Sequence, residues 1–416
     1  MNICEQIESQ VRTYSRAFPA VFCRAKDAML YDEHGNEYID FFAGAGTMNY
    51  GHNNPRINGA VVEYIRQDGV IHSLDMFTTA KIRFLEEFDS TILRPRKLEY
   101  KIQFCGPTGT NAVEAALKLA RKVKQRRGVI AFTGGFHGLS TGSLSVTGNI
   151  HYKDEFYSDS ANVAFMPYDG YLGTSVDTAH VLRRVLSDKS SGVSIPAAII
   201  LESIQAEGGV NVASVTWLQQ IAEICKEFDI VLIVDDIQVG NGRSGDFFSY
   251  ERSGITPDIV TLSKAIGGGM PLAIVLIKPE LDEWRPGEHT GTFRGNNLAF
   301  VAATAALEYW RSEEFSKTIK DKSTLLRSLL EDIESRHQEL ITEIRGYGLI
   351  QGIIMPGDGI ARQVSSEAFR RGLIVELAGA NGQVLKLLPP LTIDGATLEK
   401  GVAIIEQAID TVAMQG

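Results

Sequence analysis

Short apolar runs rich in β-branched residues recur through the middle of the chain and alternate with segments of helical periodicity. The runs are uniformly apolar, which is typical of strands that a parallel sheet buries on both faces. Strands are therefore expected at residues 100–104, 129–132, 163–166, 197–201, 230–234, 259–262 and 272–277. Between them lie helical patterns such as 216–228, where apolar residues recur every three or four positions. The alternation predicts an α/β fold with a mostly parallel central sheet.

After residue 297 the pattern changes. Helices are expected over 298–311 and 315–336, short strands near 348–355, 373–376 and 384–388, and a last amphipathic helix over 396–414. We therefore predict a large domain over 61–310 and a small α+β domain over 311–416. Residues 1–60 are expected to join the small domain or to contact a second subunit.

Composition narrows the classes of protein. The 416 residues carry a formal net charge of −10, whereas a nucleic-acid-binding surface would be basic and clustered. No apolar run reaches 18 residues and the N-terminus has no apolar signal region, so neither a membrane span nor secretion is expected. The four cysteines are scattered without a paired spacing, which favours reduced thiols in the cytoplasm and no metal site.

Two residues suggest a specific chemistry. Lys264 stands in Ser-Lys-Ala-Ile, followed by three glycines, and Asp235 ends a predicted buried strand upstream. A lysine amine can form a Schiff base with the aldehyde of pyridoxal phosphate (PLP). A carboxylate can pair with the protonated pyridine nitrogen of that cofactor and keep its ring an electron sink. Because a single lysine in a glycine-rich turn is usually a solvated surface residue, this interpretation depends on further motifs.

One such motif is the turn that contains Gly109 and Thr110, which follows a predicted strand and opens a predicted helix over 112–124. Backbone amides and the helix N-terminus at such a turn can bind a phosphate. An ordinary helix cap explains the same turn equally well.

Two more segments follow predicted strands, where open α/β sheets bind their ligands. Phe136 and His137 come after the strand at 129–132, and an aromatic ring there can stack on a planar ligand or fill the core. Glu202 and Glu207 leave the strand at 197–201, either toward a ligand crevice or in a solvated loop.

The order of these segments resembles the class III, or ω-type, aminotransferases, which have PLP-dependent transferase fold type I. The similarity extends from about residue 15 to the end of the chain. Six segments are similar to family motifs in the same order: Thr-Gly-Thr-Asn-Ala-Val-Glu-Ala at 108–115, Phe-His-Gly at 136–138, Glu-Ser-Ile-Gln-Ala-Glu-Gly-Gly at 202–209, Asp-Asp-Ile-Gln-Val-Gly-Asn-Gly-Arg-Ser-Gly at 235–245, Ser-Lys-Ala-Ile-Gly-Gly-Gly at 263–269 and His-Thr-Gly-Thr-Phe-Arg-Gly-Asn at 289–296.

The resemblance implies a role for each matching residue. Lys264 would be the Schiff-base lysine and the proton shuttle, and Asp235 would pair with the pyridine nitrogen. Thr292 would reach the phosphate of the partner subunit, which implies a homodimer or a higher homo-oligomer. The other cofactor-binding residues implied are Gly109 and Thr110 at the phosphate, Phe136 and His137 at the ring, Glu202 in the ring pocket and Gln238 at the ring 3-oxygen.

Three residues are expected to bind substrate. Lys386 stands where many relatives carry an arginine that clamps a carboxylate, and lysine lacks the bidentate fork of arginine. Lys386 either holds 2-oxoglutarate as a point charge or only solvates a strand end. Glu207 resembles the gate carboxylate of ornithine and GABA aminotransferases. Tyr50 belongs to a segment, 42–55, that resembles the diaminobutyrate–2-oxoglutarate aminotransferases.

The resemblance thus implies an enzyme that interconverts L-2,4-diaminobutyrate plus 2-oxoglutarate and aspartate 4-semialdehyde plus L-glutamate. Its partners would be small amino and keto acids, with no nucleic acid and no membrane. Another ω-amine transaminase, acting on ornithine, GABA, lysine or a diamine, remains an alternative. So does an aminomutase or decarboxylase on the same fold.

Overall fold

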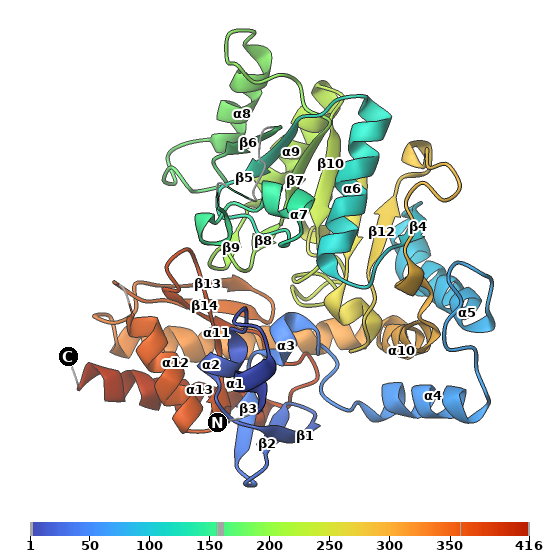
Figure 1. Ribbon diagram of the computed structural model, residues 1–416. Helices are drawn as coiled ribbons and strands as arrows, with labels where there is room; N and C mark the ends of the chain where they lie inside the picture. Colours follow the sequence, from blue (N-terminus) through green and yellow to red (C-terminus); the bar gives the residue numbers. More distant parts are fainter. Residues whose placement is uncertain (1–2, 155, 157–161, 358, 415–416) are drawn as a thin grey trace.

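A seven-stranded sheet forms the centre of the computed structural model, which describes residues 3–154, 156, 162–357 and 359–414 (Figure 1). Its strand order is β4-β12-β11-β10-β7-β5-β6. The strands are β4 (Lys101–Phe104), β5 (Val129–Phe132), β6 (Val163–Met166), β7 (Ala198–Leu201), β10 (Val231–Asp235), β11 (Ile259–Leu262) and β12 (Ile274–Ile277). Only β12 runs antiparallel to its neighbours in this sheet, so the prediction of a mostly parallel sheet is confirmed.

Both faces of this sheet are covered, as the uniformly apolar runs predict. Along β5, Ile130 and Phe132 belong to one buried cluster, whereas Val129 and Ala131 belong to another. Successive side chains of a strand point to opposite faces, so two separate cores lie on the two sides of the sheet. The helices of this region include α6 (Gly109–Lys124), α7 (Thr141–Val146), α8 (Thr178–Ser187) and α9 (Val215–Glu227).

The C-terminal part has an antiparallel sheet, ordered β13-β14-β17-β16, beside three helices. Its strands are β13 (Glu343–Tyr347), β14 (Ile350–Ile354), β16 (Glu376–Ala378) and β17 (Val384–Leu387), and its helices are α11 (Glu314–Arg336), α12 (Ile360–Arg370) and α13 (Gly395–Ala413). Strand β13 was not predicted, because Glu-Ile-Arg-Gly-Tyr is a polar edge strand with only one buried side chain. The single strand expected over 373–376 is instead divided between two sheets.

The division occurs at β15 (Leu373–Ile374), which leaves the C-terminal sheet and pairs in parallel with β3 (Glu37–Asp40). Strands β1 (Phe22–Lys26), β2 (Met29–Asp32), β3 and β15 form a further four-stranded sheet. Figure 1 shows these N-terminal strands among the C-terminal elements. The two ends of the chain therefore build one body through shared hydrogen bonds.

Long connections join this body to the central sheet. Helix α10 (Asn297–Leu307) packs against α4 (Pro55–Arg66) and α5 (Thr79–Phe88). The helix expected over 298–311 ends at Leu307 and continues as a short 3-10 turn. Among the helices of the described residues, none is both long and apolar enough to cross a membrane.

Candidate active site

Four central strands deliver the predicted residues to one edge of the sheet. Strand β5 leads to Phe136 and His137, β7 leads to Glu202, β10 ends at Asp235, and β11 leads to Lys264. These strands are parallel, so their carboxyl ends meet at the same edge, where open α/β sheets form ligand crevices.

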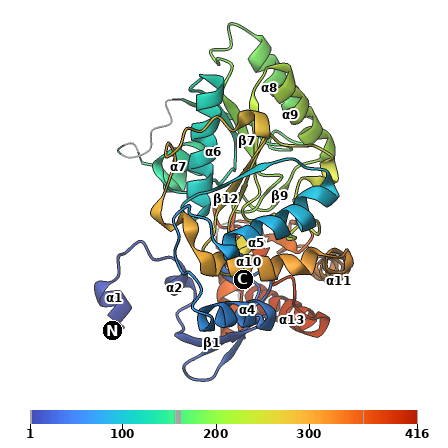
Figure 2. The ribbon, with the colours of Figure 1, turned by 90° about the vertical axis from the view of Figure 1, so that its right-hand side faces the viewer.

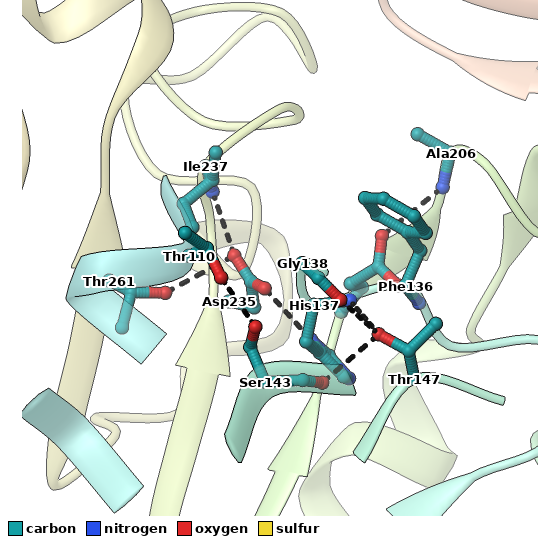
Figure 3. Close-up of polar contacts among 11 residues, drawn as sticks. Thr110, Phe136, His137, Gly138, Ser143, Thr147, Ala206, Asp235, Ile237 and Thr261 are labelled. Carbon is teal, nitrogen blue, oxygen red and sulfur yellow. Dashed lines mark hydrogen bonds and ion pairs between the residues drawn. The ribbon is translucent and has the colours of Figure 1, made fainter. Parts of the chain in front are cut away.

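Asp235 and His137 form a buried pair at this edge (Figure 3). Nδ1 of His137 lies 2.8 Å from Oδ2 of Asp235, while Oδ1 accepts from the hydroxyl of Thr261 and the amide of Ile237, both at 3.2 Å. Burial by itself lowers the pKa of His137, but the hydrogen bond and charge of Asp235 outweigh it, so the pKa is raised. The pair, together with Thr261 and Ile237, therefore fixes the position of the Asp235 carboxylate at the end of β10.

Glu202 braces the loop that carries Phe136. Its carboxylate accepts hydrogen bonds from the amide of Phe136 at 2.9 Å and from the amide of Ala206 at 3.4 Å. Burial raises the pKa of Glu202 to about 8, and the nearby charge of Asp235 acts in the same direction. The Phe136 ring is only partly buried and meets Tyr152 edge-on, with ring centroids 5.5 Å apart. This ring can therefore still face a planar ligand.

The N-terminus of α6 forms an anion cradle. Its N-cap residue, Thr108, makes no side-chain capping hydrogen bond, and no acceptor among the described residues binds the amides of Gly109 and Thr110. The hydroxyl of Thr110 contacts Ser140 Oγ at 2.6 Å and also contacts Ser143 Oγ. Free amides, hydroxyls and the helix dipole together suit a phosphate.

Glu114, one turn along α6, holds the serine loop in place, a role that the sequence analysis missed. One oxygen of its carboxylate accepts from Ser140 Oγ and from the amides of Gly142 and Ser143, at 2.5, 2.8 and 3.2 Å. The family motif contains this glutamate, but the sequence alone does not show which loop it contacts.

Lys264 lies beside Gln238, and both side chains donate to one carbonyl. The Lys264 amine and the Gln238 amide bind the carbonyl oxygen of Ala45 at 2.9 and 2.8 Å. Burial lowers the pKa of Lys264, and the charge of Lys386 acts in the same direction while Glu207 opposes both. Lys264 therefore has a larger neutral, nucleophilic fraction than a solvated lysine.

The carbonyl of Ala45 comes from a strained turn in the N-terminal segment. Ala43, Gly44 and Ala45 all have positive φ, at 48°, 57° and 56°, and Lys264 itself has φ of 53°. Left-handed backbone at non-glycine residues is uncommon and recurs at functional sites. No sequence pattern in 42–55 marked this contact, because it joins residues far apart in the chain.

Lys386 lies in a second charged cluster next to Lys264. Its amine contacts Glu207 Oε1 at 2.5 Å and Glu376 Oε2 at 3.1 Å, and its side chain is 0% exposed. Two carboxylates raise the pKa of Lys386 above its usual value although burial opposes this. The expectation that Lys386 only solvates a strand end is wrong, because it is fully buried and paired.

Glu376 was not predicted as a site residue, although a sequence signal exists. It is the charged residue in the apolar run Leu-Ile-Val-Glu-Leu-Ala, and Lys386 is the charged residue in Val-Leu-Lys-Leu-Leu. Buried charges need partners. Strands β16 and β17 place the two directly opposite each other.

Tyr50 is the prediction that the structure corrects. The side chain is 3% exposed, its hydroxyl accepts from Trp310 Nε1 at 2.9 Å, and its ring packs on Tyr309 and Phe315. An aromatic core therefore uses the whole side chain, and Tyr50 has no surface left for a substrate. Thr292, by contrast, is exposed, and its carbonyl accepts from His72 at 2.6 Å.

A cleft of about 940 Å³ adjoins these clusters. It is lined by Phe136, Tyr152, Glu207, Arg345 and Gln383, among others. Glu207 therefore connects the charged cluster at Lys386 to open space. Among the described residues, no group of three or more potential metal ligands is present.

The residues fit pyridoxal phosphate: an uncapped helix N-terminus for the phosphate, a fixed carboxylate for the ring nitrogen, and an amine of lowered pKa. An open α/β sheet that presents this set is that of a PLP-dependent enzyme of fold type I. The family model for class-III aminotransferases matches residues 11–409, and the chain belongs to that family.

Individual relatives narrow the comparison. The diaminobutyrate–2-oxoglutarate transaminase of Wolinella succinogenes is 60% identical over 412 residues, covering 99% of this chain and 96% of that protein. The enzyme of that name from Halalkalibacterium halodurans is 55% identical, covering 98% and 96%. Among solved structures, ornithine aminotransferase from Toxoplasma gondii is similar at a TM-score of 0.86 and 26% identity, covering 100% of this chain and 95% of that one.

Proposed function

We propose that this class-III aminotransferase moves the 4-amino group of L-2,4-diaminobutyrate to 2-oxoglutarate, and the reverse, with pyridoxal phosphate as cofactor. The observation that supports the chemistry most directly is the buried amine of Lys264, which lies at the same edge of the sheet as the Asp235–His137 pair. The relatives of 60% and 55% identity, both diaminobutyrate–2-oxoglutarate transaminases, support the choice of substrate.

Each part of the site has a task in this proposal. The free amides at the start of α6 and the hydroxyl of Thr110 hold the phosphate. Asp235, oriented by His137, keeps a proton on the pyridine nitrogen. When bound, pyridoxal phosphate carries the amino group and delocalises the electron pair left when a C–H bond of the substrate breaks. The Lys264 amine accepts the proton from that carbon and returns it, which its lowered pKa favours.

The assembly is part of the proposal. We place Thr292 at the phosphate of a second copy of the chain, because Thr292 is exposed and its described hydrogen bond is to His72, away from the residues that follow the four central strands. The active unit is then a homodimer or a larger homo-oligomer. We also place the enzyme in the cytoplasm, in line with four cysteines that are scattered along the chain without a paired spacing.

A panel of amine donors tests the substrate. The purified holoenzyme is given 2-oxoglutarate with 2,4-diaminobutyrate, ornithine or GABA, and glutamate formation is measured. Ornithine is one methylene longer, so its kcat/KM should be lower by about 10- to 200-fold. GABA lacks the α-amino group and should be rejected at least as strongly. A higher kcat/KM for ornithine or GABA would instead favour another ω-amine transaminase. Ornithine is included in the panel because the fold is similar to that of an ornithine aminotransferase.

Replacement of the lysine tests the chemistry. Lys264→Ala should keep the circular-dichroism spectrum and lose essentially all glutamate formation, because Lys264 is the only amine among the described residues that contacts the Ala45 carbonyl. Lys278→Ala is the matched control, since Lys278 lies at the end of β12 and pairs with Asp258 at 2.7 Å. That variant should retain turnover. Substantial activity in Lys264→Ala would contradict the proposed role.

A further inference from the structure

Two carboxylates share one contacting amine in the cluster around Lys386. Lys386 is the only cation in direct contact with Glu207 and Glu376 among the described residues, and Lys264 acts on both carboxylates only through its charge. Burial raises the pKa of Glu376, and the like charge of Glu207 acts in the same direction. A further cation at this place would relieve that repulsion.

The two carboxylates differ in what surrounds them. Glu376 is held from two sides: it lies opposite Lys386 across β16 and β17, and its Oε1 accepts from the hydroxyl of Tyr14 at 3.0 Å. Its side chain is 8% exposed. The Glu207 side chain is 22% exposed and lines the cleft. Glu376 is thus fixed, and Glu207 is the carboxylate that a ligand in the cleft can reach.

We propose that Glu376 is a specificity-determining positioning residue, which shares Lys386 and so leaves Glu207 available to accept the α-ammonium group of the amine substrate. This inference rests on the proposed function. Without Glu376, the buried amine of Lys386 would depend on Glu207 alone for its counter-charge. Glu207 would then be retained by Lys386 and lost to the substrate.

The chemistry distinguishes two substrates of equal length. Diaminobutyrate carries an α-ammonium group that GABA lacks, and the two molecules are otherwise alike. A carboxylate at the cleft that shares its amine with a second carboxylate attracts the first and gains nothing from the second. The ratio of kcat/KM for diaminobutyrate to kcat/KM for GABA therefore reports on the availability of Glu207, whereas the overall rate does not.

The decisive variant is Glu376→Gln, which keeps the shape and removes the charge. The ratio should fall by about 10- to 100-fold, the range of a hydrogen bond to a charged group. The fall should appear mainly as a higher KM for diaminobutyrate. Glu367→Gln is the matched control: this partly buried carboxylate on α12 pairs with Arg370 and Arg371, and its loss should leave the ratio unchanged.

A second variant covers the case in which Glu376→Gln does not fold. Tyr14→Phe removes only the hydroxyl that fixes Glu376, at a side chain that is 48% exposed. The ratio should fall about 2- to 10-fold, as expected for a neutral hydrogen bond. Tyr31→Phe on β2 removes a comparable hydroxyl away from the cluster and should change nothing.

Binding without turnover gives an independent readout. L-homoserine has a hydroxyl where diaminobutyrate has its reacting amine, and it keeps the α-ammonium group. 4-Hydroxybutyrate has the same hydroxyl but no α-ammonium group. Calorimetry on the holoenzyme should show that Glu376→Gln weakens L-homoserine and leaves 4-hydroxybutyrate unchanged. Equal effects on both ligands, or an unchanged kcat/KM ratio, would overturn the inference. If the wild-type enzyme does not use diaminobutyrate at all, the proposed function fails first, and this inference with it.

Discussion

At the scale of single residues, the site depends on how buried charges are paired. A buried ion is costly unless partners surround it, and each charged side chain of this site has at least one. Asp235 has His137, and Lys386 has two carboxylates. Among the described residues, the hydrogen-bond partner of the Lys264 amine is a backbone carbonyl alone, and Lys264 is therefore the amine whose proton is held least firmly.

The carboxylate of Asp235 gives a prediction at this scale. Asp235→Asn preserves the shape and removes the charge proposed to keep the pyridine nitrogen protonated. Turnover should fall by roughly two orders of magnitude, on the order of 3 kcal/mol in the activation barrier. Steady-state kinetics of both proteins with saturating cofactor measures this fall in kcat.

Asp236 provides the matched control. This neighbouring carboxylate is also buried, but it bonds to the amide and hydroxyl of Ser249 and does not contact His137. Burial raises its pKa to about 7, so a neutral amide is a close substitute. Asp236→Asn should keep most of the turnover. If both variants lose activity equally, the effect of Asp235 is structural.

At the scale of elements, close packing determines where helices can sit. Gly401, within α13, lies against the ring of Phe41, and an added Cβ would be 2.3 Å from Cζ of that ring. Phe41 is 0% exposed and cannot move aside. Glycine is otherwise unfavourable inside a helix, so its presence here is explained by the contact.

Two glycine substitutions test this packing. Gly401→Ala should destabilise the protein, because overpacking costs about 1–3 kcal/mol and exceeds the helix propensity gained, about 1 kcal/mol. Gly59→Ala in α4 has nothing within 4 Å of the added Cβ and should stabilise instead. Thermal unfolding followed by circular dichroism should shift the two midpoints in opposite directions. A raised midpoint for Gly401→Ala would contradict the packing argument.

At the scale of the whole molecule, the N-terminal segment is part of the active site. It supplies the Ala45 carbonyl to Lys264 and the Tyr14 hydroxyl to Glu376. Figure 2 shows that α1 (Ile3–Ile7) stands away from the body, whereas α2 (Tyr14–Ala17) lies against it. Tyr14 therefore marks the place where the N-terminal arm reaches the charged cluster around Lys386.

Subunit mixing tests the proposed shared site. If Thr292 serves the neighbouring phosphate, Thr292→Ala should weaken cofactor retention, as measured by dialysis and absorbance. Hybrids of Thr292→Ala with the inactive Lys264→Ala chain should contain one doubly defective site and one intact site. Activity should then recover on mixing. No recovery, despite subunit exchange proven by native mass spectrometry, would show that each site is built from one chain.

The sequence by itself determined the mostly parallel sheet, the family and its cofactor. Uniformly apolar runs reveal buried strands, and residues that follow parallel strands meet at one edge whatever the details of packing. That logic was sufficient to propose Lys264, Asp235, His137 and Glu202 as neighbours. All four are linked in the structure: His137 contacts Asp235, and the charge of Asp235 acts on both Glu202 and Lys264.

Only the tertiary structure decided the surroundings of Lys386 and the place of Tyr50. Glu376 lies ten positions before Lys386 in the sequence, and the antiparallel register of β16 and β17 brings them opposite each other. The Ala45 and Tyr14 contacts, by contrast, join the first 50 residues to elements more than 200 positions away. Local patterns carry no information about such contacts, because the packing of whole elements creates them.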